Sequence, residues 1–220
     1  MKLRFKSLML MLLVTLPLLT SCFSESDVDN THDFLNPSET TEYLKKMQGS
    51  YKGKFYYAYI GKGGSMQLDS IDNIDWTLTE GGELKISKLP VSKFAHSLRS
   101  GSMYDFLADE VEKCDDISFE AKITPFRTHD GWIYPFAITP KENIVLNLKK
   151  DNKNYKLVLY YHEFVSISKL YYRMEGECHI HQNRMYITLP IGSSTVNEVE
   201  TGAMPSLFRY NGIRPEQSKK

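Results

Sequence analysis

The sequence lacks an excess of charge of either sign. Its 27 lysines and arginines stand against 27 aspartates and glutamates. Nucleic-acid binding needs a concentrated positive face, so this balance argues against DNA or RNA as a partner. The chain has 220 residues, of which 41% are hydrophobic. This is enough to build the core of one domain of ordinary size.

Recognisable catalytic signatures are also missing. The chain has no Gly-x-Ser-x-Gly nucleophile elbow and no phosphate-binding glycine loop. Gly61-Lys62-Gly63-Gly64 is short and lies between two strand-like segments, where glycine supplies turn angles. Cys114 is followed by two aspartates, and adjacent carboxylates disfavour a reactive thiolate. The sequence therefore predicts neither an enzyme nor a cofactor.

The longest apolar run is too short for a transmembrane helix. It extends from Leu8 to Leu19, about a dozen residues, whereas a membrane span needs about 20. Three basic residues precede it, at positions 2, 4 and 6, and Leu19-Thr20-Ser21-Cys22 follows it directly. This order is typical of a signal peptide. Its last four residues resemble a bacterial lipobox, which implies that residues 1–21 are removed and that Cys22 carries fatty acids such as palmitate.

A polar segment over residues 22–36 follows the predicted lipidation site. It is rich in Ser, Asp, Glu and Asn and has too few apolar residues to bury a core, so we expect a tether. The lipid on Cys22 would join the protein to the outer membrane. Acidic residues close behind that cysteine resemble a surface-export signal of Bacteroidota-type lipoproteins, and both the periplasmic side and the cell surface stay open as locations.

Residues 37–192 have the pattern of a single, mainly β domain. Asn36-Pro37-Ser38-Glu39 is typical of a capped helix start, and residues 90–111 carry stripes that predict two short helices at one end or edge of a sheet. Elsewhere apolar residues alternate with polar ones between turns. The predicted strands lie near residues 51–59, 74–78, 84–86, 117–123, 132–138, 144–148, 155–161, 170–180 and 185–189.

About eight or nine such strands predict an antiparallel meander, closed as a barrel or folded as a sandwich. Over residues 193–220 apolar and polar residues no longer alternate, and we expect an irregular C-terminal segment there. The inward-facing residues are mostly Tyr, Phe, Trp, Leu and Met, which predicts an interior filled by side chains. Any ligand would then bind at the barrel mouth or on the loops 61–64 and 128–132.

Two pairs of residues are candidates for special roles. Cys114 and Cys178 could form a disulfide in an exported protein, but spacing alone leaves two free thiols equally open. His179 and His181 could project to one side of a strand and share a metal ion, with Glu175, Glu177 or His162 as further ligands. Their face is opposite an apolar stripe and so is expected to meet water, and we predict no metal site.

A likeness to known families rests on several of these features together. The helix followed by Gly49-x-Tyr51-x-Gly53 resembles the entry of lipocalin-like envelope proteins. With the lipobox, the acidic tether, Trp76 and the Leu89-Pro90-Val91 corner, the chain resembles uncharacterised Bacteroides-type lipoproteins, among them domain of unknown function 4840. That resemblance implies a location and a fold but no catalytic residues. We therefore expect a noncatalytic binding or interaction module; a metal-dependent hydrolase using His179 and His181, or a small-ligand carrier with an interior cavity, is the alternative.

Overall fold

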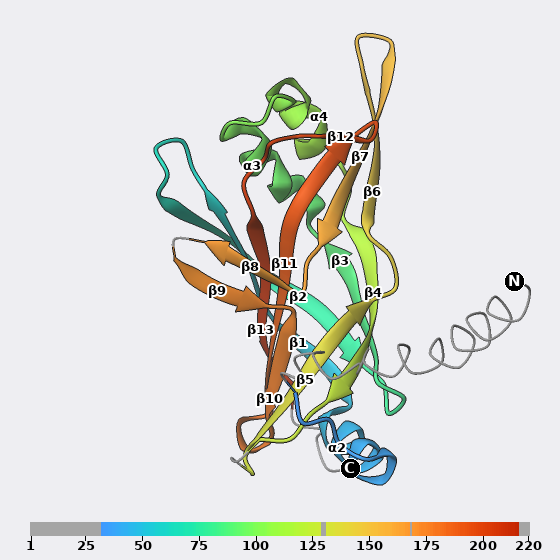
Figure 1. Cartoon of the computed structure of the whole chain (residues 1–220). Helices are drawn as coiled ribbons and strands as arrows, with labels where there is room; N and C mark the ends of the chain where they lie inside the picture. The colour runs from blue at the N-terminus through green and yellow to red at the C-terminus, as the bar shows by residue number, and fades with distance from the viewer. Residues whose placement is uncertain (1–31, 129–130, 168, 216–220) are drawn as a thin grey trace, which may run out of the picture. The chain divides into compact units, whose positions relative to one another are not determined.

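A computed structural model describes residues 32–128, 131–167 and 169–215 of the chain (Figure 1). The chain divides into two units, residues 1–33 and 34–220, and every element described below belongs to the second. The predicted signal peptide, Cys22 and residues 23–31 of the predicted tether lie outside the described residues. In the part that is described, no helix has both the length and the apolar character to span a membrane.

The first described element is helix α2, Pro37–Met47, which begins at the predicted cap. Asn36 Oδ1 accepts a hydrogen bond from the Glu39 backbone N–H at 3.0 Å, and the Glu39 carboxylate accepts one from the Asn36 N–H at 3.1 Å. This reciprocal pair satisfies two amides of the first turn. Leu44 and Met47 bury their side chains in the core, so α2 covers one end of the sheet structure.

Eight antiparallel strands close into a barrel, as predicted, and the sandwich alternative is excluded (Figure 1). The ring follows the order β10-β5-β4-β3-β2-β1-β13-β11 and closes because β11 pairs with β10. The strands of the ring are β1 (Gly49–Ile60), β2 (Met66–Leu78), β3 (Glu83–Leu89), β4 (Ile117–Pro125), β5 (Ile133–Pro140), β10 (Glu175–His179), β11 (Arg184–Val196) and β13 (Ser206–Ile213).

A hairpin of two further strands extends the barrel wall at the end away from α2 (Figure 1). Strand β6 (Ile144–Lys150) pairs with β7 (Lys153–Tyr161), and β7 pairs with the second half of β11, from Ile191 to Val196. The short strand β12 (Val199–Glu200) pairs with the end of β11. In this half of the barrel, β6 is the last strand of the hydrogen-bonded path.

The helical insertion between β3 and β4 lies at the end of the barrel opposite α2 (Figure 1). It consists of η2 (Val91–Phe94), α3 (Ala95–Arg99), η3 (Asp105–Leu107) and α4 (Ala108–Glu112), where two short helices were predicted. Most of their apolar residues, including Phe94, Leu98 and Val111, are buried in the main core. Ser102 Oγ donates to the Thr201 carbonyl at 2.7 Å, which ties the insertion to the chain between β12 and β13.

The predicted continuous strand over residues 170–180 is wrong. The chain breaks at Met174: residues 170–173 form β9 (Leu170–Arg173), which pairs with β8 (Phe164–Ile167) in a separate two-stranded sheet. Val165 and Ile167 pack on Ala58 and Leu207, outside the main core. Alternation alone does not distinguish this arrangement from a barrel strand, because a hairpin lying on the outer wall also has one apolar face.

The predicted irregular segment at 193–220 is also wrong in its larger part. Strand β11 continues to Val196, and β13 is a full member of the barrel, between β1 and β11. Its first residues, Ser206, Leu207 and Phe208, are all buried. Leu207 faces outward under the β8–β9 hairpin, so both faces of β13 are covered there and the two-residue period disappears.

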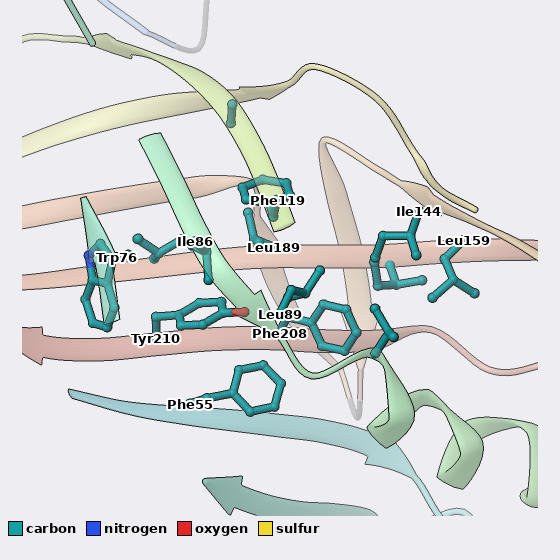
Figure 2. Close-up of a cluster of buried hydrophobic side chains, with 14 of the residues drawn as sticks. Phe55, Trp76, Ile86, Leu89, Phe119, Ile144, Leu159, Leu189, Phe208 and Tyr210 are labelled. Atoms are coloured by element: carbon teal, nitrogen blue, oxygen red, sulfur yellow. The ribbon is translucent and has the colours of Figure 1, made fainter. Parts of the chain in front are cut away.

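Bulky side chains fill the centre of the barrel (Figure 2). The rings of Tyr51 and Trp76 stack with centroids 6.0 Å apart, and Phe55 and Tyr210 are 5.1 Å apart. This packing agrees with the large inward residues seen in the sequence.

Candidate binding cleft

A cleft opens in the barrel wall where β4 and β6 diverge. The Lys141 N–H donates to the Glu120 carbonyl at 2.9 Å, continuing the β4–β5 ladder by one step. Beyond this bond, Ile117–Glu120 pairs with β3 on one side and with no strand of the described chain on the other. We call the opening between this edge and the start of β6 the seam cleft; its volume is about 470 Å³.

The seam cleft combines an apolar wall with polar groups. Phe119 and Ile144 are buried, and Tyr161 comes from β7; the rings of Phe119 and Tyr161 meet edge to face, with centroids 5.5 Å apart. Figure 2 shows Phe119 and Ile144 in the same cluster as Leu89 and Phe208, so the cleft borders the barrel core. The remaining lining residues are Ile117, Ser118, Glu120, Lys141, Glu142, Asn143 and Val145.

Two buried tyrosine hydroxyls are the most unusual feature of this region. Tyr161 Oη and Tyr210 Oη are buried and have no hydrogen-bond partner among the described residues. Burial raises the pKa of both phenols, and electrostatic interactions with Tyr161 and Asp116 raise that of Tyr210 further. Both phenols are therefore protonated at neutral pH. A buried hydroxyl without a partner costs about 1–3 kcal/mol, a cost that a bound polar atom could offset.

A network of surface ion pairs lies where the chain passes from β5 to β6. Lys141 Nζ lies 3.0 Å from Glu120 Oε2 and 3.2 Å from Glu83 Oε2, and Lys85 Nζ lies 3.1 Å from Glu120 Oε1. The hydrogen bond from Lys141 is the main cause that lowers the pKa of Glu120. Exposed pairs contribute little stability, but this network links β3, β4 and the chain after β5 at one end of the cleft.

The two histidines of the candidate metal pair lie in different surroundings. His179 ends β10, and its Nε2 is 3.0 Å from Glu177 Oε1. His181 lies in the turn η4 (Ile180–Gln182), where its ring packs on Trp132 with centroids 3.9 Å apart. The strand ends between them, so the expected i, i+2 projection is lost. Among the described residues, no group of three or more His, Cys, Asp or Glu side chains could hold a metal ion.

The two cysteines of the possible disulfide are free thiols. Cys114 follows α4, and its Sγ donates to the carbonyl of Glu110 within that helix at 3.5 Å. Cys178 is buried in the barrel, 3.6 Å from Tyr51 Oη. Burial is the main cause that raises the pKa of both thiols, which makes them poor nucleophiles.

The seam cleft is a candidate site that the sequence did not indicate. Tyr161 was expected in the strand at 155–161, and the segment that holds Tyr210 was expected to be irregular. Ligand binding was expected at the barrel mouth or on the loops 61–64 and 128–132, whereas the cleft lies between two strands. The available signal was a tyrosine in an apolar stripe. Its hydroxyl needs a hydrogen-bond partner when the ring is buried in a filled core, and a ligand can supply one.

These features define a small antiparallel β-barrel with a helix at one end, a helical insertion at the other and a split wall. A family model, domain of unknown function (DUF4840), matches residues 46–187, which is more than half of the chain. The chain therefore belongs to the DUF4840 family. Comparisons with curated proteins and with solved structures gave no match.

Proposed function

We propose that this chain is a lipid-anchored protein of the bacterial cell envelope that binds a ligand, without catalysis, in the seam cleft. The observation that carries the binding role is the buried, unpartnered hydroxyl of Tyr161 in the lining of an open cleft, together with that of Tyr210 in the adjoining core. Within the residues that the structure describes, folding leaves both groups without hydrogen bonds. A ligand that supplies polar atoms would recover that free energy on binding.

The lining supports a ligand that is polar at one point and apolar at another. Protonated phenols can donate to an oxygen of the ligand and accept from a hydroxyl or amide. Phe119 and Ile144 offer apolar contact beside them. The volume of about 470 Å³ lies within the usual range for ligand sites.

The chemistry of the cleft favours binding over catalysis. Among its titratable groups, Tyr161 and Lys141 have raised pKa values, and the pKa of Glu120 is lowered by its lysine partners. A general base near neutral pH would need the opposite shift in the carboxylate. The hydrolase alternative has less support, because His179 and His181 have separate neighbours.

The cellular location rests on the sequence. A basic start, a short apolar run and a lipobox that ends at Cys22 favour export and acylation of that cysteine. The polar residues between Cys22 and α2 would serve as the tether. The small-ligand carrier hypothesis placed a ligand in an interior cavity. Here the ligand binds instead in the seam cleft of the barrel wall.

A fragment screen tests the binding site. The probes are small compounds with a hydroxyl, amide or carboxylate on an aliphatic or aromatic body, added to ¹⁵N-labelled protein. We expect amide shifts that gather at residues 117–120 and 141–145, and binding that is about tenfold weaker in the double variant Tyr161→Phe/Tyr210→Phe.

The control is Tyr160→Phe, next in sequence, whose hydroxyl lies 3.4 Å from Thr195 Oγ1 in a partly buried contact. It should bind the probes as the wild type does. The proposal fails if no probe shifts the cleft residues, or if the double variant and the control bind equally well.

A further inference from the structure

We propose that the occupant of the seam cleft is an extended segment of another protein, which adds as a strand to the free edge of β4 over Ile117–Glu120. This inference rests on the proposed function, since it assigns a chemical class to the ligand of the same cleft. Its evidence is different: it comes from the backbone of β4 and β6 and not from the tyrosine hydroxyls.

The backbone of β4 presents hydrogen-bonding groups to the cleft. Glu120 accepts from the Lys141 N–H, so the N–H and C=O of Glu120 point to the side of β5. In a strand, the residue two positions away points its groups to the same side, and so the N–H and C=O of Ser118 also face the cleft. Within the described chain, no strand pairs with them there.

The sheet indicates the direction of the incoming segment. Every strand pair in the structure is antiparallel, and β5 pairs with β4 in that orientation from Ala121 to Pro125. A segment that continues the direction of β5 beyond Lys141 would extend this ladder. The free edge of four residues corresponds to about 13 Å of strand.

A peptide matches the cleft better than a purely apolar molecule. Its backbone carries a donor and an acceptor that can pair with the C=O and N–H of Ser118, whereas an acyl chain would leave these two groups unsatisfied. Alternate side chains would face inward to Phe119 and Tyr161, and a small hydroxyl or amide side chain there could bond the phenols. The other side chains would face water beside Lys141 and Glu142.

The second wall of the cleft favours a free segment over a folded partner. Strand β6 borders the opening on the side opposite β4, and its outer edge pairs with no other strand of the described chain. The edge strand of a folded domain, including a second copy of this chain, carries its own sheet and would collide with β6. An extended terminus or loop can enter between the two edges.

The test uses a phage-displayed library of random linear octapeptides, selected on the full chain from residue 23. Selected peptides are made synthetically, and hydrogen exchange of the backbone amides is followed by NMR. We expect the amides of Ser118 and Glu120 to exchange quickly in the free protein and at least about tenfold more slowly with peptide.

Peptides N-methylated at single positions give the sharper readout. Methylation of the amides that face β4 should weaken binding about tenfold or more, and methylation at the alternate positions much less. Ser118→Pro, which removes the N–H of the edge, should abolish binding, and Ser118→Ala should preserve it. If Ser118→Pro does not fold, the N-methyl series and the amide exchange decide the question.

The outcomes separate this inference from the proposed function. If small fragments shift the cleft residues but no octapeptide protects Ser118 and Glu120, strand addition is wrong and a small-molecule site remains. Peptides that bind without an alternating N-methyl pattern also overturn it, as does dimerisation of the chain through β4. If neither fragments nor peptides affect the cleft, both proposals fail.

Discussion

The indole of Trp76 occupies the space that a side chain at position 212 would need. A Cβ on Gly212 would lie 2.8 Å from Trp76 Cζ2, closer still to Cη2, and 2.8 Å from the Lys52 carbonyl oxygen. Strands β2 and β13 are thus fitted to each other through β1, which lies between them in the sheet. Gly212 is required here for close approach and not for an unusual backbone angle.

The change Gly212→Ala should therefore lower the free energy of unfolding by at least about 2 kcal/mol, because the core must move to admit one methyl group. Urea denaturation followed by tryptophan fluorescence measures this. Gly81→Ala is the matched control: its Cβ would meet only Thr79 Oγ1, at 3.7 Å, and the change should stay within about 0.5 kcal/mol. Equal losses in the two variants would refute the packing argument.

The unpartnered hydroxyl of Tyr210 should add nothing to stability. Tyr210→Phe is expected to leave the free energy of unfolding unchanged or to raise it by up to about 1 kcal/mol, because no hydrogen bond is lost. The comparison is Tyr57→Phe. Tyr57 Oη lies 2.6 Å from Ser97 Oγ in the core, so this change should cost about 1–3 kcal/mol. A clear loss for Tyr210→Phe would mean that its hydroxyl has a partner within the folded protein.

Replacing His179 and His181 together by alanine should change the free energy of unfolding by less than about 1 kcal/mol, as surface changes usually do. The two side chains contact Glu177 and Trp132 separately. Thermal unfolding with added zinc, and again with a chelator, should shift the melting temperature of the wild type by no more than about 2–4 °C. A larger stabilisation by zinc that the double variant lacks would restore the metal hypothesis.

Acylation of Cys22 is expected from the apolar run that ends at it. Cells fed a labelled palmitate should incorporate label into the wild-type chain, which should sediment with membranes. Cys22→Ala should lose both properties, whereas Cys114→Ala should keep them, since that thiol lies after α4 in the folded domain. Equal labelling of the wild type and Cys22→Ala would rule out the anchor.

Removal of β13 should prevent folding. A chain that ends at Glu200 lacks the strand that pairs with both β1 and β11, and it exposes the apolar surface beneath Phe208 and Tyr210. We expect no cooperative thermal transition for it by circular dichroism. A chain that ends at Pro215 keeps β13 and should unfold like the full protein. Folding of the shorter chain would show that the barrel closes without its last strand.

Local signals in the sequence predicted many elements well. The Asn36–Glu39 pair predicted the start of α2, because a capping box depends only on residues three positions apart. Alternation predicted β4 and β6, since each has one buried and one solvated face. The antiparallel barrel followed from the number and spacing of such segments.

Other features depend on contacts between distant parts of the chain, and no local pattern shows them. Leu207 is buried on the outside of the barrel only because β8 and β9 cover it. The seam cleft exists because the chain after Lys141 leaves β4. Tyr161 and Tyr210 look like ordinary core aromatics until their hydroxyl environments are known.

The position of β13 in the chain also governs when the barrel can form. Lys52 pairs with Ile213, so the ring closes only through a contact between residues far apart in sequence. Loop closure of this length is slow compared with hairpin formation. During synthesis, β1 has no barrel partner on this side until residues 206–213 have left the ribosome. The export proposed above would therefore move a chain whose barrel has not closed, with hairpins that form early but lack their shared core until the final strand arrives.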